Sequence, residues 1–276
     1  MRALDSINPG MAKPARLASI GAFLPLVFSL LGIALAHGAA PTVALSKNPI
    51  IIFLCLIIAS SCVMVAVPRA FSWDWETKYF GVSVFHLGSV ALLGLVPFFC
   101  LVLYAQLPVA ARICLLLVNV VLHAAWCHRF IRYYQKINGD DHFRRCLYQE
   151  DEDAVYYMQR GDKHLFEKHC KFNQIPEDRY FGTSLLLSFS LVPIMGTVKE
   201  VVGLPFVHSF LIIGALPISL MGAGLAIRGW LVFYFYPIQI RKITGKRVYV
   251  DMGGKPDIPP SRKRTTSESG KREYWL

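Results

Sequence analysis

Six long apolar runs constrain this chain more than any other feature. A helix needs about 20 mostly apolar residues to cross the roughly 30 Å hydrocarbon core of a bilayer, where lipid offers no partner to an unpaired backbone amide. The six runs cover residues 17–36, 49–67, 82–103, 108–127, 182–198 and 206–227. A hydrophobic fraction of 54% and a mean hydropathy of +0.44 agree with this interpretation. The sequence therefore predicts an all-α integral membrane protein with six transmembrane helices.

The first run has an alternative interpretation as a secretory signal. Residues 1–16 are short and basic, and the run ends in small residues around positions 34–41. That pattern resembles a cleavage site, but the run is long for the apolar part of a signal. We favour a retained first helix. Cleavage would leave five transmembrane helices.

Lysine and arginine residues predict the orientation. Three precede the first run, two lie between the second and third, ten lie in residues 128–181, and ten follow Arg228. The opposite side has only Lys47, Arg112 and Lys199. Because short cytoplasmic loops retain basic residues, we expect both termini and residues 128–181 to be cytoplasmic, in a bacterial inner membrane. This asymmetry also explains most of the +11 net charge, so nucleic-acid binding is disfavoured.

Residues 128–181 form a polar insert between the fourth and fifth runs. The pattern predicts that the fourth helix continues to about residue 135 and ends at the turn-forming sequence 138–141. The acidic residues 150–153 are typical of a helix start and precede residues 154–158, while the apolar spacing within 163–173 fits another amphipathic helix. We therefore predict a cytoplasmic helical insert.

The remaining segments lie at the two ends of the chain. Residues 1–16 are a basic cytoplasmic tail, and residues 17–127 hold the first four spans. Residues 182–236 hold the last two spans and end in an interfacial aromatic belt. Residues 237–276 are basic and poor in apolar side chains, which predicts a largely disordered tail that contacts anionic lipid headgroups.

Four side chains are candidate interface anchors: Trp73, Trp75, Arg228 and Trp230. Amphipathic rings are selected at the headgroup region, and a long basic side chain near a helix end extends to the interface. The alternatives are a substrate gate formed by the first two tryptophans and a buried anion site at Arg228.

Small residues recur every four positions in the sixth run, at Ala215, Ser219 and Ala223. Such a stripe lets two helix backbones approach closely in lipid. The stripe predicts a packing surface, either within the bundle or between protomers.

Histidine and cysteine residues gather near the predicted inner face. His86 and His123 lie at similar depth on antiparallel spans, and Cys127 and His128 follow. These four are candidate ligands for a haem or a metal ion, with zinc or copper as the metals. The alternative is interfacial histidines that hydrogen bond to the backbone or to water. No cofactor or metal is assigned.

The six runs contain no aspartate or glutamate, which weighs against an ion-coupled transporter. No nucleophile elbow, phosphate-binding glycine loop or kinase signature is present either, so no catalytic residue is assigned. The favoured hypothesis is a non-enzymatic component of a membrane assembly, of the secretion, conjugation, defence or toxin-immunity type. It would dock protein partners, or further copies of itself, through its insert and tail. The alternatives are a channel or transporter subunit, and a membrane haem or metal protein or enzyme that uses the inner-face histidines.

Overall fold

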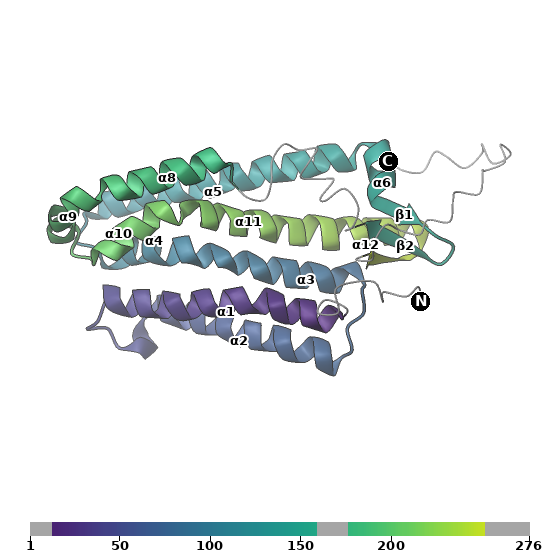
Figure 1. Cartoon of the computed structure of the whole chain (residues 1–276), viewed down its shortest axis with the longest axis horizontal. Helices are drawn as coiled ribbons and strands as arrows, with labels where there is room; N and C mark the ends of the chain where they lie inside the picture. The colour runs from purple at the N-terminus through teal and green to yellow at the C-terminus, as the bar shows by residue number, and fades with distance from the viewer. Residues whose placement is uncertain (1–12, 159–175, 252–276) are drawn as a thin grey trace.

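The computed structural model describes residues 13–158 and 176–251, which form an elongated helical bundle with a small sheet at one end (Figure 1). The structure is mostly helical, and five helical segments are long and apolar enough to cross a membrane. These five segments are Pro14–Ala39, Pro49–Ala70, Thr77–Tyr104, Val109–Asn138 and Leu216–Thr244. The prediction of a mostly helical chain with several helices that could cross a membrane is confirmed, whereas the predicted number of six such helices is not.

The first four runs become four long helical segments. The elements in chain order are α1 (Pro14–Ala39), η1 (Leu45–Lys47), α2 (Pro49–Ala70), α3 (Thr77–Leu87), η2 (Gly88–Ala91), α4 (Leu92–Tyr104) and α5 (Val109–Asn138). The 3-10 turn η2 joins α3 to α4 without a loop. Helix α5 extends past the apolar run and ends at Asn138, as the sequence predicts.

Two polar side chains satisfy backbone groups where these helices begin and end. Asn48 precedes α2, and its side-chain oxygen accepts hydrogen bonds from the N–H groups of Ile50 and Ile51, at 3.1 and 3.4 Å. Arg112 donates from its guanidinium to carbonyls at the end of α4 and in the loop that follows, including that of Ala105 at 2.7 Å. Arg112 therefore satisfies carbonyl groups at the end of α4, in addition to being one of the three basic residues on the predicted non-cytoplasmic side.

The last two predicted spans differ from the expected single helices. The run 182–198 is divided between α8 (Asp178–Ser190), η3 (Val192–Ile194) and α9 (Met195–Val202), so no single helix there is long enough to cross a membrane. The run 206–227 is interrupted between α10 (Phe206–Gly214) and α11 (Leu216–Trp230). Pro217 lacks an N–H donor, so it is accommodated in the first turn of α11.

Three strands replace part of the predicted helical insert and disordered tail, so the expectation of an all-α fold is wrong at this end. After α6 (Asp141–Leu147) come β1 (Tyr148–Glu150) and β2 (Ala154–Met158), and β3 (Arg247–Asp251) lies in the tail. The acidic residues 151–153 form the β1–β2 turn instead of starting a helix. Strand β2 pairs antiparallel with β1 and parallel with β3.

Helices α3 and α11 approach each other through glycine residues. An added side-chain carbon on Gly222 would lie 2.5 Å from the backbone oxygen of Gly88, and one on Gly229 would lie 3.0 Å from that of Gly81. Further along, one on Gly94 would lie 2.6 Å from the backbone oxygen of Ala215. Each of α3, η2 and α4 therefore makes a close backbone approach to α11, or to the residue before it, at a glycine.

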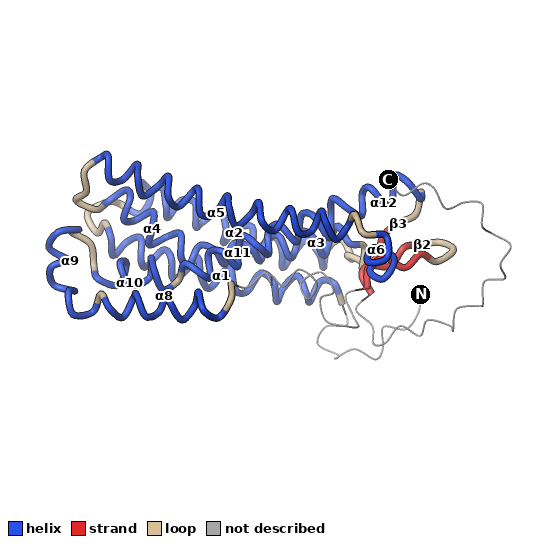
Figure 2. The backbone as a smooth tube through the Cα atoms, turned by 90° about the horizontal axis from the view of Figure 1, so that it is seen from above, coloured by secondary structure: helices blue, strands red, loops and turns tan. Residues whose placement is uncertain are grey.

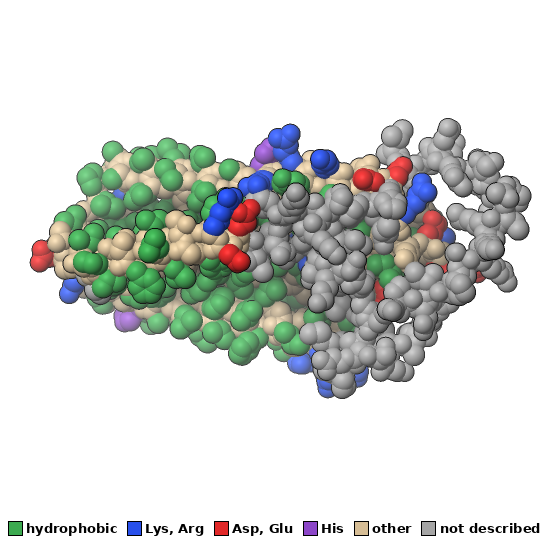
Figure 3. Space-filling model, turned by 45° about the horizontal axis from the view of Figure 1, so that its top comes forward, with side chains coloured by type: hydrophobic (Ala, Val, Ile, Leu, Met, Phe, Trp, Pro, Cys, Tyr) green, Lys and Arg blue, Asp and Glu red, His purple; other side chains and the backbone are tan. Residues whose placement is uncertain are grey.

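The largest core lies where the sheet meets the helix ends. Val155, Tyr157, Val248 and Val250 face inward from β2 and β3, onto side chains of α5 and of the segment formed by α11, η4 (Leu231–Phe235) and α12 (Tyr236–Thr244). The first described residues of α1 and the last of β3 lie at this same end (Figure 2). On the face shown in Figure 3, the half of the bundle away from the sheet is largely apolar apart from a few charges at its tip, whereas charged side chains are frequent from the middle toward the sheet end.

Three predicted segments lie outside the described residues: the N-terminal tail 1–12, the amphipathic helix 163–173 and the tail beyond 251.

Candidate functional site

The sheet end of the bundle is the candidate functional site, because it is the part with both an ordered polar surface and a dense core. Backbone and side-chain hydrogen bonds fix β3 to the start of α3. The Thr77 hydroxyl donates to the carbonyl of Val248 at 3.2 Å, and the N–H of Val250 donates to the carbonyl of Trp75 at 2.7 Å. Glu76, which is 7% exposed, lies 3.0 Å from the amine of Lys78. The sheet is therefore bound to the bundle on this edge.

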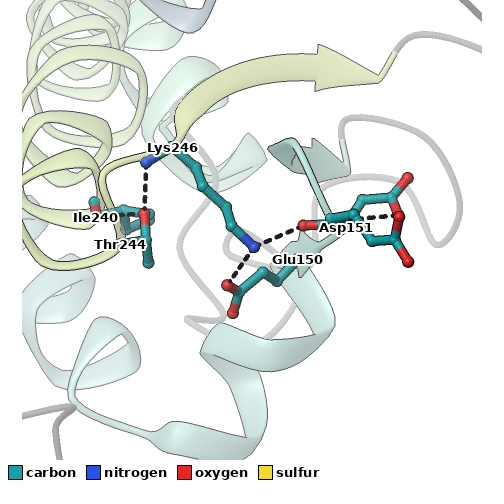
Figure 4. A network of polar contacts seen from close by, with 6 residues as sticks. Glu150, Asp151, Ile240, Thr244 and Lys246 are labelled. Carbon is teal, nitrogen blue, oxygen red and sulfur yellow. Dashed lines mark hydrogen bonds and ion pairs between the residues drawn. The ribbon is translucent and has the colours of Figure 1, made fainter.

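Lys246 ties the tail to the insert from the other direction (Figure 4). Its amine donates to the Glu150 carboxylate at 2.9 Å and to the carbonyl of Asp151 at 2.8 Å. Its backbone N–H donates to the hydroxyl of Thr244, which in turn donates to the carbonyl of Ile240. Gly245 follows α12 with a φ of +73°, a conformation that favours glycine and turns the chain into β3.

The π-helical turn η4 lies directly beneath β1. The hydroxyl of Tyr148, on β1, donates to the carbonyl of Val232 at 3.1 Å, in a fully buried setting. Such single turns often occur at functional positions in helices. Burial raises the pKa of Tyr148 well above its usual value, Tyr157 and Tyr236 add to the rise, and Arg228 opposes it. Tyr148 is therefore neutral and a committed hydrogen-bond donor.

Arg228 is buried at this junction, so the prediction that it extends to the interface is wrong. The residue is only 6% exposed, and its guanidinium carbon lies 5.4 Å from the ring centre of Phe233. A cation over an aromatic face is stabilised electrostatically when water is excluded. The physical reason for the difference is the sheet, which covers helix surface that a simple bundle leaves in the headgroup region.

The outer face of the sheet presents a small aromatic and basic surface. Tyr156 on β2 and Tyr249 on β3 are register partners whose ring centres lie 6.3 Å apart, and Tyr156 is 38% exposed. Arg247 lies on the same face and is fully exposed; a hydrogen bond with Tyr249 raises the pKa of Arg247. We call these three residues the outer-face surface.

The candidate ligand histidines contact different helices. The Nε2 atom of His86 lies 2.9 Å from the hydroxyl oxygen of Ser61 on α2. His123 instead contacts α11, as described next. Cys127 is half-buried and His128 is exposed. Within residues 13–158 and 176–251, no group of three or more His, Cys, Asp or Glu side chains is arranged to hold a metal ion.

His123 has a hydrogen-bonding partner at each ring nitrogen. Its Nδ1 lies 3.0 Å from the carbonyl oxygen of Asn119, and its Nε2 lies 3.2 Å from the hydroxyl oxygen of Ser219. A carbonyl only accepts, so Nδ1 carries a proton. The Ser219 hydroxyl is 2.7 Å from the carbonyl of Leu216, which therefore competes with a neutral Nε2 for the single hydroxyl proton. The pair links α5 to α11 at the depth of the apolar runs.

The predicted small-residue stripe lies in contacts with other parts of the bundle. Ser219 is buried, its Cβ lies against Gly94, and Ala223 packs on the core beneath the sheet. The glycines that make the closest contacts lie outside the predicted stripe. A spacing of seven between positions 81 and 88, and between 222 and 229, is the signal that identifies them.

The predicted tryptophan anchors divide into two groups. Trp230 is 52% exposed and stacks on Tyr234, with ring centres 5.1 Å apart. Trp73 and Trp75 are half-buried beside the sheet, where Trp73 stacks on Tyr79 at 4.7 Å. The outer-face tyrosines 156 and 249 were not identified as site residues from the sequence, because their exposure depends on the pairing of β2 with β3.

Comparison with known proteins found no matching family model, and no match among curated proteins or solved structures.

Proposed function

We propose that this chain is a non-enzymatic subunit of a membrane assembly and that it binds a protein partner through the outer-face surface formed by Tyr156, Arg247 and Tyr249. Tyrosine and arginine are enriched in the energetically dominant positions of protein interfaces, because each combines large contact area with directed hydrogen bonds. The carrying observation is the exposed Tyr156 beside the half-buried Tyr249, on strands β2 and β3 whose opposite face is buried.

The anchoring of the sheet supports this proposal. A surface that is pre-organised loses little conformational entropy on binding. Thr77 connects β3 to α3, Tyr148 connects β1 to η4, and Lys246 joins the segment after α12 to β1. A partner that binds the outer face is thereby fixed in position relative to the membrane helices.

The topology that accompanies this proposal has six crossings, with α8, η3 and α9 together making the fifth. The distribution of basic residues favours a cytoplasmic location for both termini and for residues 128–181, in a cell with an inner membrane. The outer-face surface would then meet a cytoplasmic protein. Secretion, conjugation, defence and toxin-immunity systems are the classes of assembly with such subunits.

Affinity purification in mild detergent tests the proposal. The double variant Tyr156→Ala/Arg247→Ala is expected to lose proteins that co-purify stoichiometrically with the wild-type chain. Tyr234→Ala removes an exposed aromatic side chain from the helical segment, away from the outer face, and is expected to retain them. Circular dichroism checks that both variants stay folded.

Three results would contradict the proposal. One is a folded wild-type chain that purifies without any stoichiometric partner. The second is a Soret band or bound metal that disappears in His123→Ala, which favours a haem or metal protein. The third is ion flux through liposomes that contain this chain alone, which favours a channel.

A further inference from the structure

A groove of about 550 Å³ lies at the sheet end and shares no residue with the outer-face surface. It is formed by the last turn of α5, by α6 and by α12, which lie together at this end (Figure 2). The polar side chains that line the groove are Gln135, Asn138, Arg144, Tyr236, Gln239 and Lys242.

The groove offers hydrogen-bond donors and positive charge. The carboxamides of Gln135, Asn138 and Gln239 form no hydrogen bond with the part of the chain that the structure describes, and neither does the Lys242 amine. No described aspartate or glutamate lines the groove. Arg144 is ion-paired with Asp141, so Lys242 is the main source of net charge. This combination suits an anion with several acceptor oxygens.

The position of the groove along the bundle indicates which anion. Trp230, Tyr234 and Phe235 are exposed just before α12, and exposed aromatic rings of this kind mark the boundary of the hydrocarbon core. A rise of 1.5 Å per residue places Gln239 and Lys242 about 6 and 10 Å beyond Phe235. The headgroup layer extends about 5 to 7 Å beyond the core on each side. A flexible lysine side chain reaches back into that layer.

We propose that the groove between α5 and α12 binds the phosphate-bearing headgroup of an anionic glycerophospholipid. The Lys242 amine pairs with the phosphate, and the carboxamides of Gln135, Asn138 and Gln239 donate to its oxygens or to the glycerol. The acyl chains then run from the groove back toward the hydrocarbon core along the ring of Phe235, which lines the groove and is 41% exposed. Gln239 and Lys242 belong to the predicted basic tail, 237–276, and the groove adds directed hydrogen bonds to the general attraction of that tail to anionic lipid.

Lipid binding to the purified full chain tests this site. The protein is exchanged into nanodiscs of phosphatidylcholine that contain increasing fractions of phosphatidylglycerol, and retained lipid is measured by native mass spectrometry. The wild type is expected to retain phosphatidylglycerol in preference to phosphatidylcholine. Lys242→Gln is expected to lower that preference about fivefold, as one basic group near the surface contributes. Lys242→Arg, which keeps the positive charge, is expected to show the wild-type preference for phosphatidylglycerol.

Lys136→Gln is the matched control, because this exposed lysine lies on the same end of α5 but does not line the groove. It is expected to keep the wild-type preference. An equal loss in Lys136→Gln and Lys242→Gln would overturn the proposal, since it indicates general charge attraction. Equal retention of both lipids by the wild type would also overturn it. So would complete displacement of phosphatidylglycerol by millimolar inorganic phosphate, which identifies a soluble anion as the ligand.

Discussion

Tyr148 shows how one side chain couples the sheet to the helices. Its buried hydroxyl donates to a carbonyl of the π-helical turn. Both the packing of the ring and this hydrogen bond form only when β1 lies against that turn. The sequence analysis does not single out Tyr148, which lies between the predicted turn at 138–141 and the acidic residues 150–153. Its role depends on contact with Val232, which is 84 residues away, and no local pattern predicts a contact of that kind.

Tyr148→Phe is expected to lower the free energy of unfolding by about 0.5 to 1.5 kcal/mol at pH 8, because the Val232 carbonyl loses its donor. The pKa of Tyr148 is raised in the folded state, so its contribution is complete below about pH 10, where a free tyrosine titrates. Above that pH the unfolded chain releases the proton first, and the contribution falls as pH rises. Thermal unfolding from pH 8 to 11 should therefore show the two proteins converging. A constant difference would contradict this prediction.

His123 and Ser219 form a contact whose strength a double-mutant cycle measures. His123→Leu and Ser219→Ala each remove one side of the hydrogen bond between α5 and α11. We expect a coupling energy of about 0.6 kcal/mol, the average for such pairs in membranes, measured by unfolding in mixed micelles. Additive single effects would show that the two side chains do not interact.

At the scale of elements, apolar runs predict helices well and their interruptions poorly. The runs before residue 128 predict α1, α2 and α5 closely, because length and apolarity alone decide whether a helix can cross a bilayer. The break after Gly214 is not visible in hydropathy, since the residues on both sides are apolar. Strand β2 is also missed. Its run of Val155, Tyr156 and Tyr157 favours a strand, but the acidic residues before it favour a helix start, and pairing with a distant strand decides between them.

Gly222 is expected to tolerate no larger residue, because an added Cβ would lie 2.5 Å from backbone atoms of η2. In Gly222→Ala, better helix propensity gains about 0.5 to 1 kcal/mol, whereas overpacking costs about 1 to 3 kcal/mol. We therefore expect a net loss of stability, measured by thermal unfolding in detergent. Gly182→Ala is the control, since nothing lies within 4 Å of its added carbon, and it should be neutral or stabilising. Equal effects at both positions would contradict the close helix approach.

At the scale of the whole molecule, the described chain ends and the sheet lie at one end of the bundle, and η1 lies near the other (Figure 1). In a background without the native cysteines, Asp153→Cys and Lys47→Cys are therefore expected to react with a membrane-impermeant maleimide from opposite sides of sealed vesicles. The positive-inside rule predicts that Asp153→Cys is cytoplasmic. Labelling of both positions from one side would contradict the arrangement of the bundle.

The parallel pairing of β2 with β3 has a consequence for how the protein is made. Strand β3 follows α12, the last helix among the described residues, so the surface beneath the sheet stays incomplete until translation has passed Asp251. A product that stops earlier exposes Val155 and Tyr157 to proteases, although its earlier helices are already inserted. Strand β3 thus completes the cover over this core, and protease sensitivity distinguishes a chain that contains β3 from one that lacks it.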